Sequence, residues 1–216
     1  MKALNKLKDP VSGLTHFIGF LLAIAGLYFL IRQGSKTHSA RILVSFVIYG
    51  TSLILLYGSS TLYHWLPLGK AGGQKLRKLD HIMIFFLIAG TYTPISLISL
   101  GGFWGWTMFG LVWTIALGGT VTKLFYINAP RKLYVSIYLA MGWIVVLFAY
   151  PVSQMLSAKA ITFLFAGGMG YTVGAVLYYL KKPDPFPGIF GFHEIWHLFV
   201  MTGSFFHWWM IYNYVN

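Results

Sequence analysis

The sequence predicts an all-α integral membrane protein, a bundle of seven transmembrane helices, from its composition and from the places where its charges fall. Of its 216 residues, 57% are hydrophobic and only 9% are charged, whereas a soluble domain carries about 25% charged residues. Its sixteen Lys and Arg residues, set against four acids, lie in short gaps between long apolar runs, as in multispan membrane proteins. This pattern excludes a soluble enzyme, a disordered regulator and a nucleic-acid-binding protein with a solvated basic face.

The first four helices follow from apolar runs long enough to cross a bilayer, which takes about 20 residues. Residues 14–31 contain a single ionisable group, His16, and their length favours a retained helix over a cleaved signal peptide. Residues 82–122 form an uncharged run of 41 residues, which is enough for two helices with a break in the glycine-rich segment 101–105. We expect these four helices, the third of them kinked at Pro94, over residues 14–33, 41–64, 79–100 and 104–124.

Three more helices complete the unit. The apolar run that begins at residue 133 divides near Pro151 and Lys159, and the last apolar segment reaches from about Ile189 to Tyr212. Because no linker or long polar loop interrupts the chain, all seven helices belong to one membrane domain of residues 1–216. We expect the last three helices over residues 132–150, 158–180 and 189–212.

The basic residues predict the orientation of the bundle, because cytoplasmic loops of membrane proteins accumulate Lys and Arg. With the N-terminus inside, twelve of the sixteen basic residues fall on the cytoplasmic side. The remaining four are Arg32, Lys36, Arg41 and Lys159. We therefore expect a cytoplasmic N-terminus and a C-terminus outside.

Three clusters of polar residues interrupt the apolar runs, and ionisable groups inside a membrane span are functional candidates by default. Ser60 and His64 end the second helix, Asp80 begins the third, and His193 and His197 begin the last. In the predicted topology all three positions are cytoplasmic. The clusters should therefore lie at one depth, just within the inner leaflet.

The clusters contain the ligands of a zinc site. The chain has no cysteine, so any metal must be held by His and carboxylate groups. His193 and His197 are four residues apart and project from one helical face, and His64 can supply a third nitrogen. Three His ligands and a water form a catalytic zinc site with an open position. Asp80 lies at the depth needed to orient that water or take its proton, and Ser60 lies one turn from His64, beside the ligands.

An alternative comes from the same segment, because residues 193–197 read H-E-x-x-H, the signature of zinc proteases. In that case Glu194 is the general base, Asp80 is a possible third ligand, and the protein is an intramembrane metalloprotease. The other polar groups are expected to be structural. We assign packing roles to His16, His81 and His207, and turn or cap roles to Asp9 and Asp184, which both lie beside a proline.

Taken together, the clusters resemble the haemolysin III family, the bacterial branch of the progestin and adipoQ receptor superfamily, which includes the adiponectin receptors and is related to alkaline ceramidases. The resemblance spans nearly the whole chain. It rests on Ser60-x3-His64, on Leu79-Asp80-His81 continuing to Ile88-Ala89-Gly90-Thr91-Tyr92-Thr93-Pro94, and on His193-Glu194-x-Trp196-His197. One departure lies at the start of the first helix, where this chain has Asp9-Pro10-Val11-Ser12 and many bacterial members have a Glu and an Asn.

The resemblance implies a seven-helix bundle in the bacterial cytoplasmic membrane, with zinc held by His64, His193 and His197. It also implies that Asp80 contacts the zinc-bound water and that Ser60 lies beside the site. The implied activity is zinc-dependent hydrolysis of a lipid amide, as in a ceramidase, with membrane lipids as partners and a role in membrane-lipid homeostasis. Two alternatives stay open: a receptor or regulator with a structural zinc, and a pore-forming cytolysin, as the family name suggests.

Overall fold

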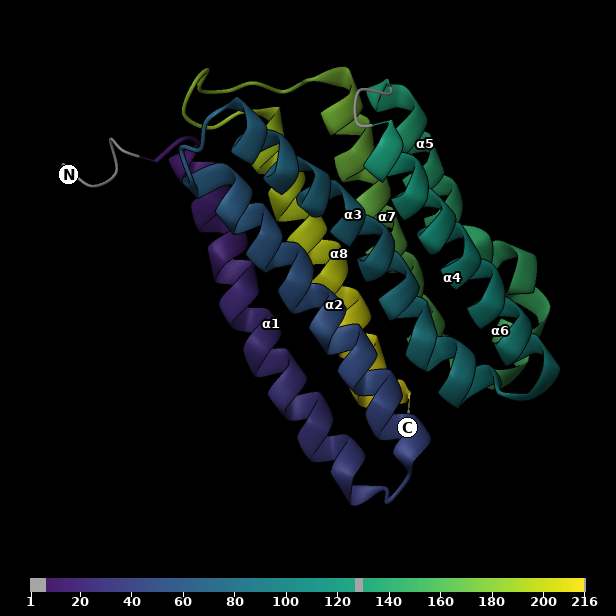
Figure 1. Cartoon of the computed structure of the whole chain (residues 1–216). Helices are drawn as coiled ribbons and strands as arrows, with labels where there is room; N and C mark the ends of the chain where they lie inside the picture. The colour runs from purple at the N-terminus through teal and green to yellow at the C-terminus, as the bar shows by residue number, and fades with distance from the viewer. Residues whose placement is uncertain (1–6, 127–129, 216) are drawn as a thin grey trace.

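The computed structural model describes residues 7–126 and 130–215, and over these residues the chain is helical, with no strand. The helices run up and down in chain order, and Figure 1 shows them side by side in one bundle. The α-helices are α1 (Pro10–Lys36), α2 (Ala40–Trp65), α3 (Lys70–Pro94), α4 (Gly102–Phe125), α5 (Arg131–Gly142), α6 (Ala149–Met155), α7 (Ala158–Leu180) and α8 (Phe192–Tyr214). A π-helical segment, Ile95–Leu100, extends α3, and a 3-10 segment, Ile144–Phe148, joins α5 to α6.

Within the described residues, six helical segments are long and apolar enough to cross a membrane. They are α1, α2, α3 with its π-helical extension, α4, the α5–α6 segment and α7. The seventh expected crossing, α8, is 23 residues long but carries several His residues and a Glu, and it is not among the six. The count of seven therefore stays a prediction. Figure 1 shows α1 beginning at one end of the bundle and α8 ending at the other.

Large apolar side chains cover the outside of the bundle. Leu22, Leu147 and Phe165 expose 61%, 76% and 57% of their surface. Soluble monomers rarely expose contiguous apolar surface on this scale, whereas lipid chains cover it without cost. The outward-facing residues thus agree with the apolar runs in assigning the bundle to a membrane.

Two helices differ from their predicted form. Helix α3 begins at Lys70 rather than at residue 79, because its basic first turns are helical although they are not apolar. After Pro94 the chain changes from α to π geometry, since proline removes a backbone donor and its ring crowds the preceding turn. The expected helix over 132–150 is divided into α5, the 3-10 segment and α6. The predicted break after helix three is confirmed at Gly101, whose φ of 57° favours glycine.

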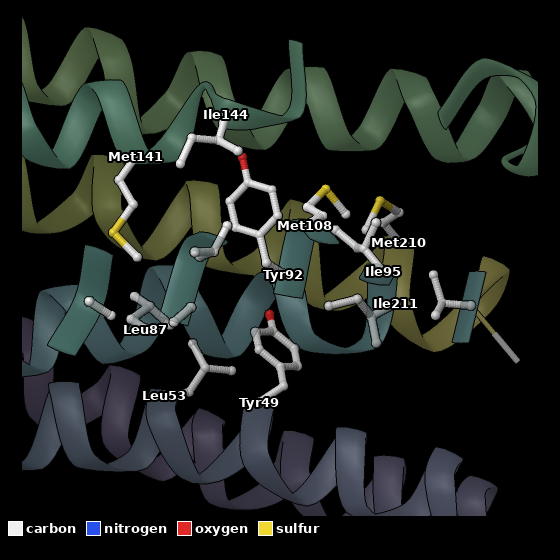
Figure 2. Close-up of a cluster of buried hydrophobic side chains, with 14 of the residues drawn as sticks. Tyr49, Leu53, Leu87, Tyr92, Ile95, Met108, Met141, Ile144, Met210 and Ile211 are labelled. Atoms are coloured by element: carbon white, nitrogen blue, oxygen red, sulfur yellow. The ribbon is translucent and has the colours of Figure 1, made fainter. Parts of the chain in front are cut away.

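The hydrophobic core lies inside the bundle, where side chains from several helices meet (Figure 2). Tyr49 of α2, Tyr92 of α3, Met108 of α4, Met141 of α5 and Met210 of α8 meet there, all of them buried. Because each comes from a different helix, this cluster fixes the helices relative to one another. The arrangement places the start of α8 between α1, α2 and α7.

Ser204 of α8 makes hydrogen bonds to two other helices inside this core. Its hydroxyl accepts a hydrogen bond from Tyr57 at 2.8 Å and lies 2.8 Å from the hydroxyl of Tyr171. These contacts join α8 to α2 and α7. Glycine allows α7 and α8 to approach closely, because a Cβ on Gly170 would lie 3.3 Å from the backbone nitrogen of Gly203.

Candidate metal centre

Three histidines meet at the end of the bundle where α2 ends and α8 begins. Ligand nitrogens of His64, His193 and His197 all lie within 4.8 Å of one another. His64 and His197 are buried and His193 is partly exposed. The helical spacing of the α8 pair and the packing of α2 against them therefore produce the convergence that the sequence predicts.

The orientation of His64 is fixed by Asp9, which directly precedes α1. The Nδ1 atom of His64 lies 3.0 Å from Oδ2 of Asp9. Burial raises the pKa of Asp9, but hydrogen bonds from His64 and Lys8 outweigh this and hold it below its usual 3.8. Asp9 is therefore an anion that accepts the Nδ1 proton, which leaves the Nε2 lone pair of His64 free for a metal. Asp9 is the N-cap residue of α1, but its side chain makes no capping bond there and contacts His64 instead.

His197 is oriented in the same way, again by α1. Its Nδ1 atom lies 3.1 Å from the backbone oxygen of Ser12 and 3.1 Å from the hydroxyl of Thr15. A carbonyl oxygen only accepts, so Nδ1 carries the proton and Nε2 presents its lone pair. Two of the three histidines thus have the tautomer that a metal ligand needs.

The donor set fits zinc. Zn–N bonds of about 2.0–2.1 Å in a tetrahedral site place ligand nitrogens roughly 3.3 Å apart, and the Nε2 atoms of His64 and His193 are separated by 3.2 Å. Three imidazoles with no cysteine are typical of a zinc site that keeps a fourth position open. The geometry therefore supports a metal site, and the histidines are the residues that would hold the ion.

Asp80 and Ser60 lie beside the histidines and form their own pair. Asp80 is outside the group of mutually close ligand atoms, but it lines the same cavity as His64 and His193. The buried Ser60 side chain is a hydrogen-bonding partner of the Asp80 carboxylate. Ser60 thus acts toward Asp80 rather than directly toward a histidine.

Glu194 serves as a helix cap. One of its carboxylate oxygens accepts a 2.8 Å hydrogen bond from the backbone nitrogen of Gly191, and the other accepts from the hydroxyl of Ser12. The first contact satisfies a free backbone donor at the start of α8, as the glutamate of a capping box does, and the second ties α8 to α1. Both oxygens are engaged, which counts against a general-base role for Glu194 in an H-E-x-x-H protease.

A cavity of about 930 Å³ extends from the histidines into the bundle. Asp80 and Ile95 both line it and are fifteen residues apart along one helix, which corresponds to roughly 22 Å. Beyond the polar end its wall is mostly apolar. Representative lining residues are Leu87, Ile88, Val145, Val152 and Leu164. The cavity is thus a long apolar pocket with the candidate metal centre at one end.

Of three further histidines in the bundle, His16 and His207 are buried and His81 is partly exposed. His207 lies deep in the bundle, where its Nε2 atom is 3.0 Å from the backbone oxygen of Leu164, in keeping with the predicted packing role. His16 also packs, but its ring stacks on that of His197 with centroids 3.6 Å apart. His81 lines the cavity beside Asp80.

The start of α1 is what the sequence interpretation missed. Asp9, Ser12, Thr15 and His16 all contact the histidines or Glu194. Their spacing of three to four residues places them on one helical face, at the end of the first helix that the topology assigns to the same depth as the clusters. The sequence contains this spacing of polar residues, but the spacing does not show which polar group each side chain contacts.

A model of the family described as haemolysin-III related matches residues 4–208. The chain belongs to the haemolysin III family. It is 42% identical to the Hemolysin-3 homolog of Bacillus subtilis (strain 168) over 91% of this chain and 89% of that protein. It is 40% identical to Hemolysin-3 of Bacillus cereus over 91% of this chain and 87% of that protein.

A more distant relative connects this haemolysin III protein to the wider superfamily. The Adiponectin receptor protein of Drosophila melanogaster is 26% identical over 89% of this chain and 47% of its own length. The predicted resemblance is therefore confirmed. Together with the apolar helices, the family identifies a multi-pass protein of the cell membrane.

Proposed function

We propose that this haemolysin III protein is a zinc-dependent hydrolase that cleaves a lipid amide from within the membrane. The observation that carries the proposal is the position of three convergent histidines and a separate carboxylate, Asp80, at one end of a long apolar cavity. The volume of this cavity, about 930 Å³, lies in the range of ligand-binding pockets. We also propose seven crossings with a cytoplasmic N-terminus, which places the site in the inner leaflet.

The residues of the chain divide the chemistry among them. His64, His193 and His197 would hold the ion. When bound, zinc supplies a Lewis acid for the substrate carbonyl and lowers the pKa of a coordinated water toward about 7. Asp80 takes a proton from the attacking water and returns it to the leaving amine. Ser60 orients the Asp80 carboxylate, and the apolar wall holds the acyl chain.

Metal analysis and one matched pair of variants test this function. Purified protein should contain about one zinc, lost in His193→Ala, in keeping with a three-histidine site. Asp80→Asn should keep the metal but lose conversion of lipid amides, followed by mass spectrometry of membrane lipids. Asp184→Asn makes the same chemical change at an exposed acid outside the cavity and should be silent. Absence of zinc from fresh wild-type protein, or full turnover in Asp80→Asn, overturns the proposal.

A receptor or regulator with a structural zinc is the second candidate, and the similarity to an adiponectin receptor favours it. In that case Asp80→Asn keeps the metal, the stability and the signalling function. A lytic pore has less support, because a pore needs a polar stripe across the bilayer. Here the ligand histidines and Asp80 gather at one end of the cavity.

A further inference from the structure

A buried lysine lines the same cavity as the histidines. Lys123, near the end of α4, exposes only 1% of its surface and lines the cavity. Its Nζ atom lies 3.6 Å from the centroid of the Tyr134 ring. A cation–π contact offsets only part of the cost of burying an ammonium group, which is large unless a counter-charge is present. An anion bound near Lys123 would therefore stabilise its buried charge.

A second cation lines the same part of the cavity. Arg77 of α3 is partly exposed, and Lys123 interacts electrostatically with both Arg77 and Asp80. All four acids of the chain lie in the described residues, and the ion pairs that Asp9 forms there with Lys8 and His64 include neither Arg77 nor Lys123. Arg77 and Lys123 thus lie in the cavity wall without a carboxylate within ion-pair distance.

The neighbouring Lys78 shows what a structural lysine at this end of the bundle does. Its Nζ atom donates a 2.8 Å hydrogen bond to the backbone oxygen of Leu124, one of the last carbonyls of α4. Lys78 does not line the cavity. Helix capping therefore accounts for Lys78, whereas Lys123 lines the cavity, where Asp80 interacts with it only from beyond ion-pair distance.

We infer that Arg77 and Lys123 bind the phosphate of an anionic membrane lipid whose acyl chain occupies the cavity. Arginine and lysine are the phosphate-binding side chains of proteins, and basic pockets between transmembrane helices bind anionic headgroups. The inference rests on the proposed function for the acyl chain and narrows its substrate class to lipid amides that also carry a phosphate. A headgroup held by these cations lies beside Asp80.

Lipid competition tests the inference. Protein in a non-ionic detergent is given equal amounts of dioleoylphosphatidylglycerol and dioleoylglycerol, which share acyl chains but differ in the phosphate. Native mass spectrometry then measures the bound lipid. Wild-type protein should prefer the phospholipid by about tenfold or more. The reason is that a hydrogen bond between a cation and a phosphate contributes more binding free energy than one between neutral groups. Arg77→Gln and Lys123→Met should each lose most of this preference, and Lys123→Arg should keep it.

Controls separate the inference from its alternatives. Lys75→Gln removes an exposed cation of α3 that lies outside the cavity and should leave the preference unchanged. Equal binding of the two lipids by wild-type protein, or an equal loss in Lys75→Gln, overturns the inference. Displacement of the phospholipid by inorganic phosphate alone would assign the cations to a free anion, which also overturns it. The binding measurement needs no turnover. If wild-type protein shows the expected lipid preference but Asp80→Asn still cleaves lipid amides, only the proposed hydrolase is refuted.

Discussion

The contact between Asp9 and His64 makes a sharp prediction about metal affinity. Asp9→Asn keeps an acceptor for the Nδ1 proton of His64 but removes the negative charge, now 3.0 Å from that nitrogen. Carboxylates behind metal-bound histidines typically contribute about 10–100-fold in metal affinity, or roughly 1.4–2.8 kcal/mol. The Asp9 side chain is 41% exposed and also pairs with Lys8, so solvent and Lys8 screen its charge. We therefore expect a loss of about tenfold for Asp9→Asn, and a larger one for Asp9→Ala, which also removes the acceptor.

Zinc affinity is measured by titration against a competing chelator of known affinity, in detergent and at constant pH. Asp184→Asn is the matched control, because it makes the same change at an exposed acid outside the cavity. Unchanged affinity in Asp9→Asn refutes the orienting role of the carboxylate. An equal loss in Asp184→Asn would instead attribute the effect to net charge.

Three further predictions concern stability and the cap of α8. Gly119→Ala should lower the free energy of unfolding by about 1–3 kcal/mol, because the new Cβ would lie 2.4 Å from the ring of Phe85. The measurement is the melting temperature in detergent. The Cβ of Gly118→Ala meets no atom within 4 Å, so this variant should gain up to about 1 kcal/mol in free energy of unfolding. Equal melting temperatures of the two variants would contradict this contrast. Ser204→Ala leaves two tyrosine hydroxyls without their shared partner and should cost about 1–3 kcal/mol, a prediction that an unchanged melting curve refutes. Glu194→Gln should keep zinc, since glutamine also closes a capping box, and loss of the metal would show that Glu194 does more than cap the helix.

Much of the fold could be predicted from the sequence because membrane helices are decided locally. An apolar run of about 20 residues has to form a helix in lipid, where every backbone polar group needs an internal partner. The break at Gly101 was predictable for the same local reason. The start of α3 was not, because its basic residues give no apolar signal and their helical form depends on the helix that follows.

The three candidate ligands could also be predicted. His193 and His197 share a helical face by spacing alone, and the order of the helices brings His64 to the same end of the bundle. The roles of Asp9 and Glu194 could not be predicted, since a carboxylate beside a helix start can cap the helix or reach across to another one. Packing of α1 against α2 and α8 decided that Asp9 contacts His64 and that Glu194 caps its own helix.

The sequence by itself determined a membrane-embedded helical protein of the haemolysin III type with histidines gathered at one end, because hydrophobic runs and helical periodicity act over short stretches of chain. Only the tertiary structure decided which polar group each buried side chain contacts, that a long apolar cavity opens beside the histidines, and that Lys123 is enclosed in its wall. Hydrogen bonds form over about 3 Å. A partner at that distance is set by how distant helices pack, which spacing along one helix does not specify.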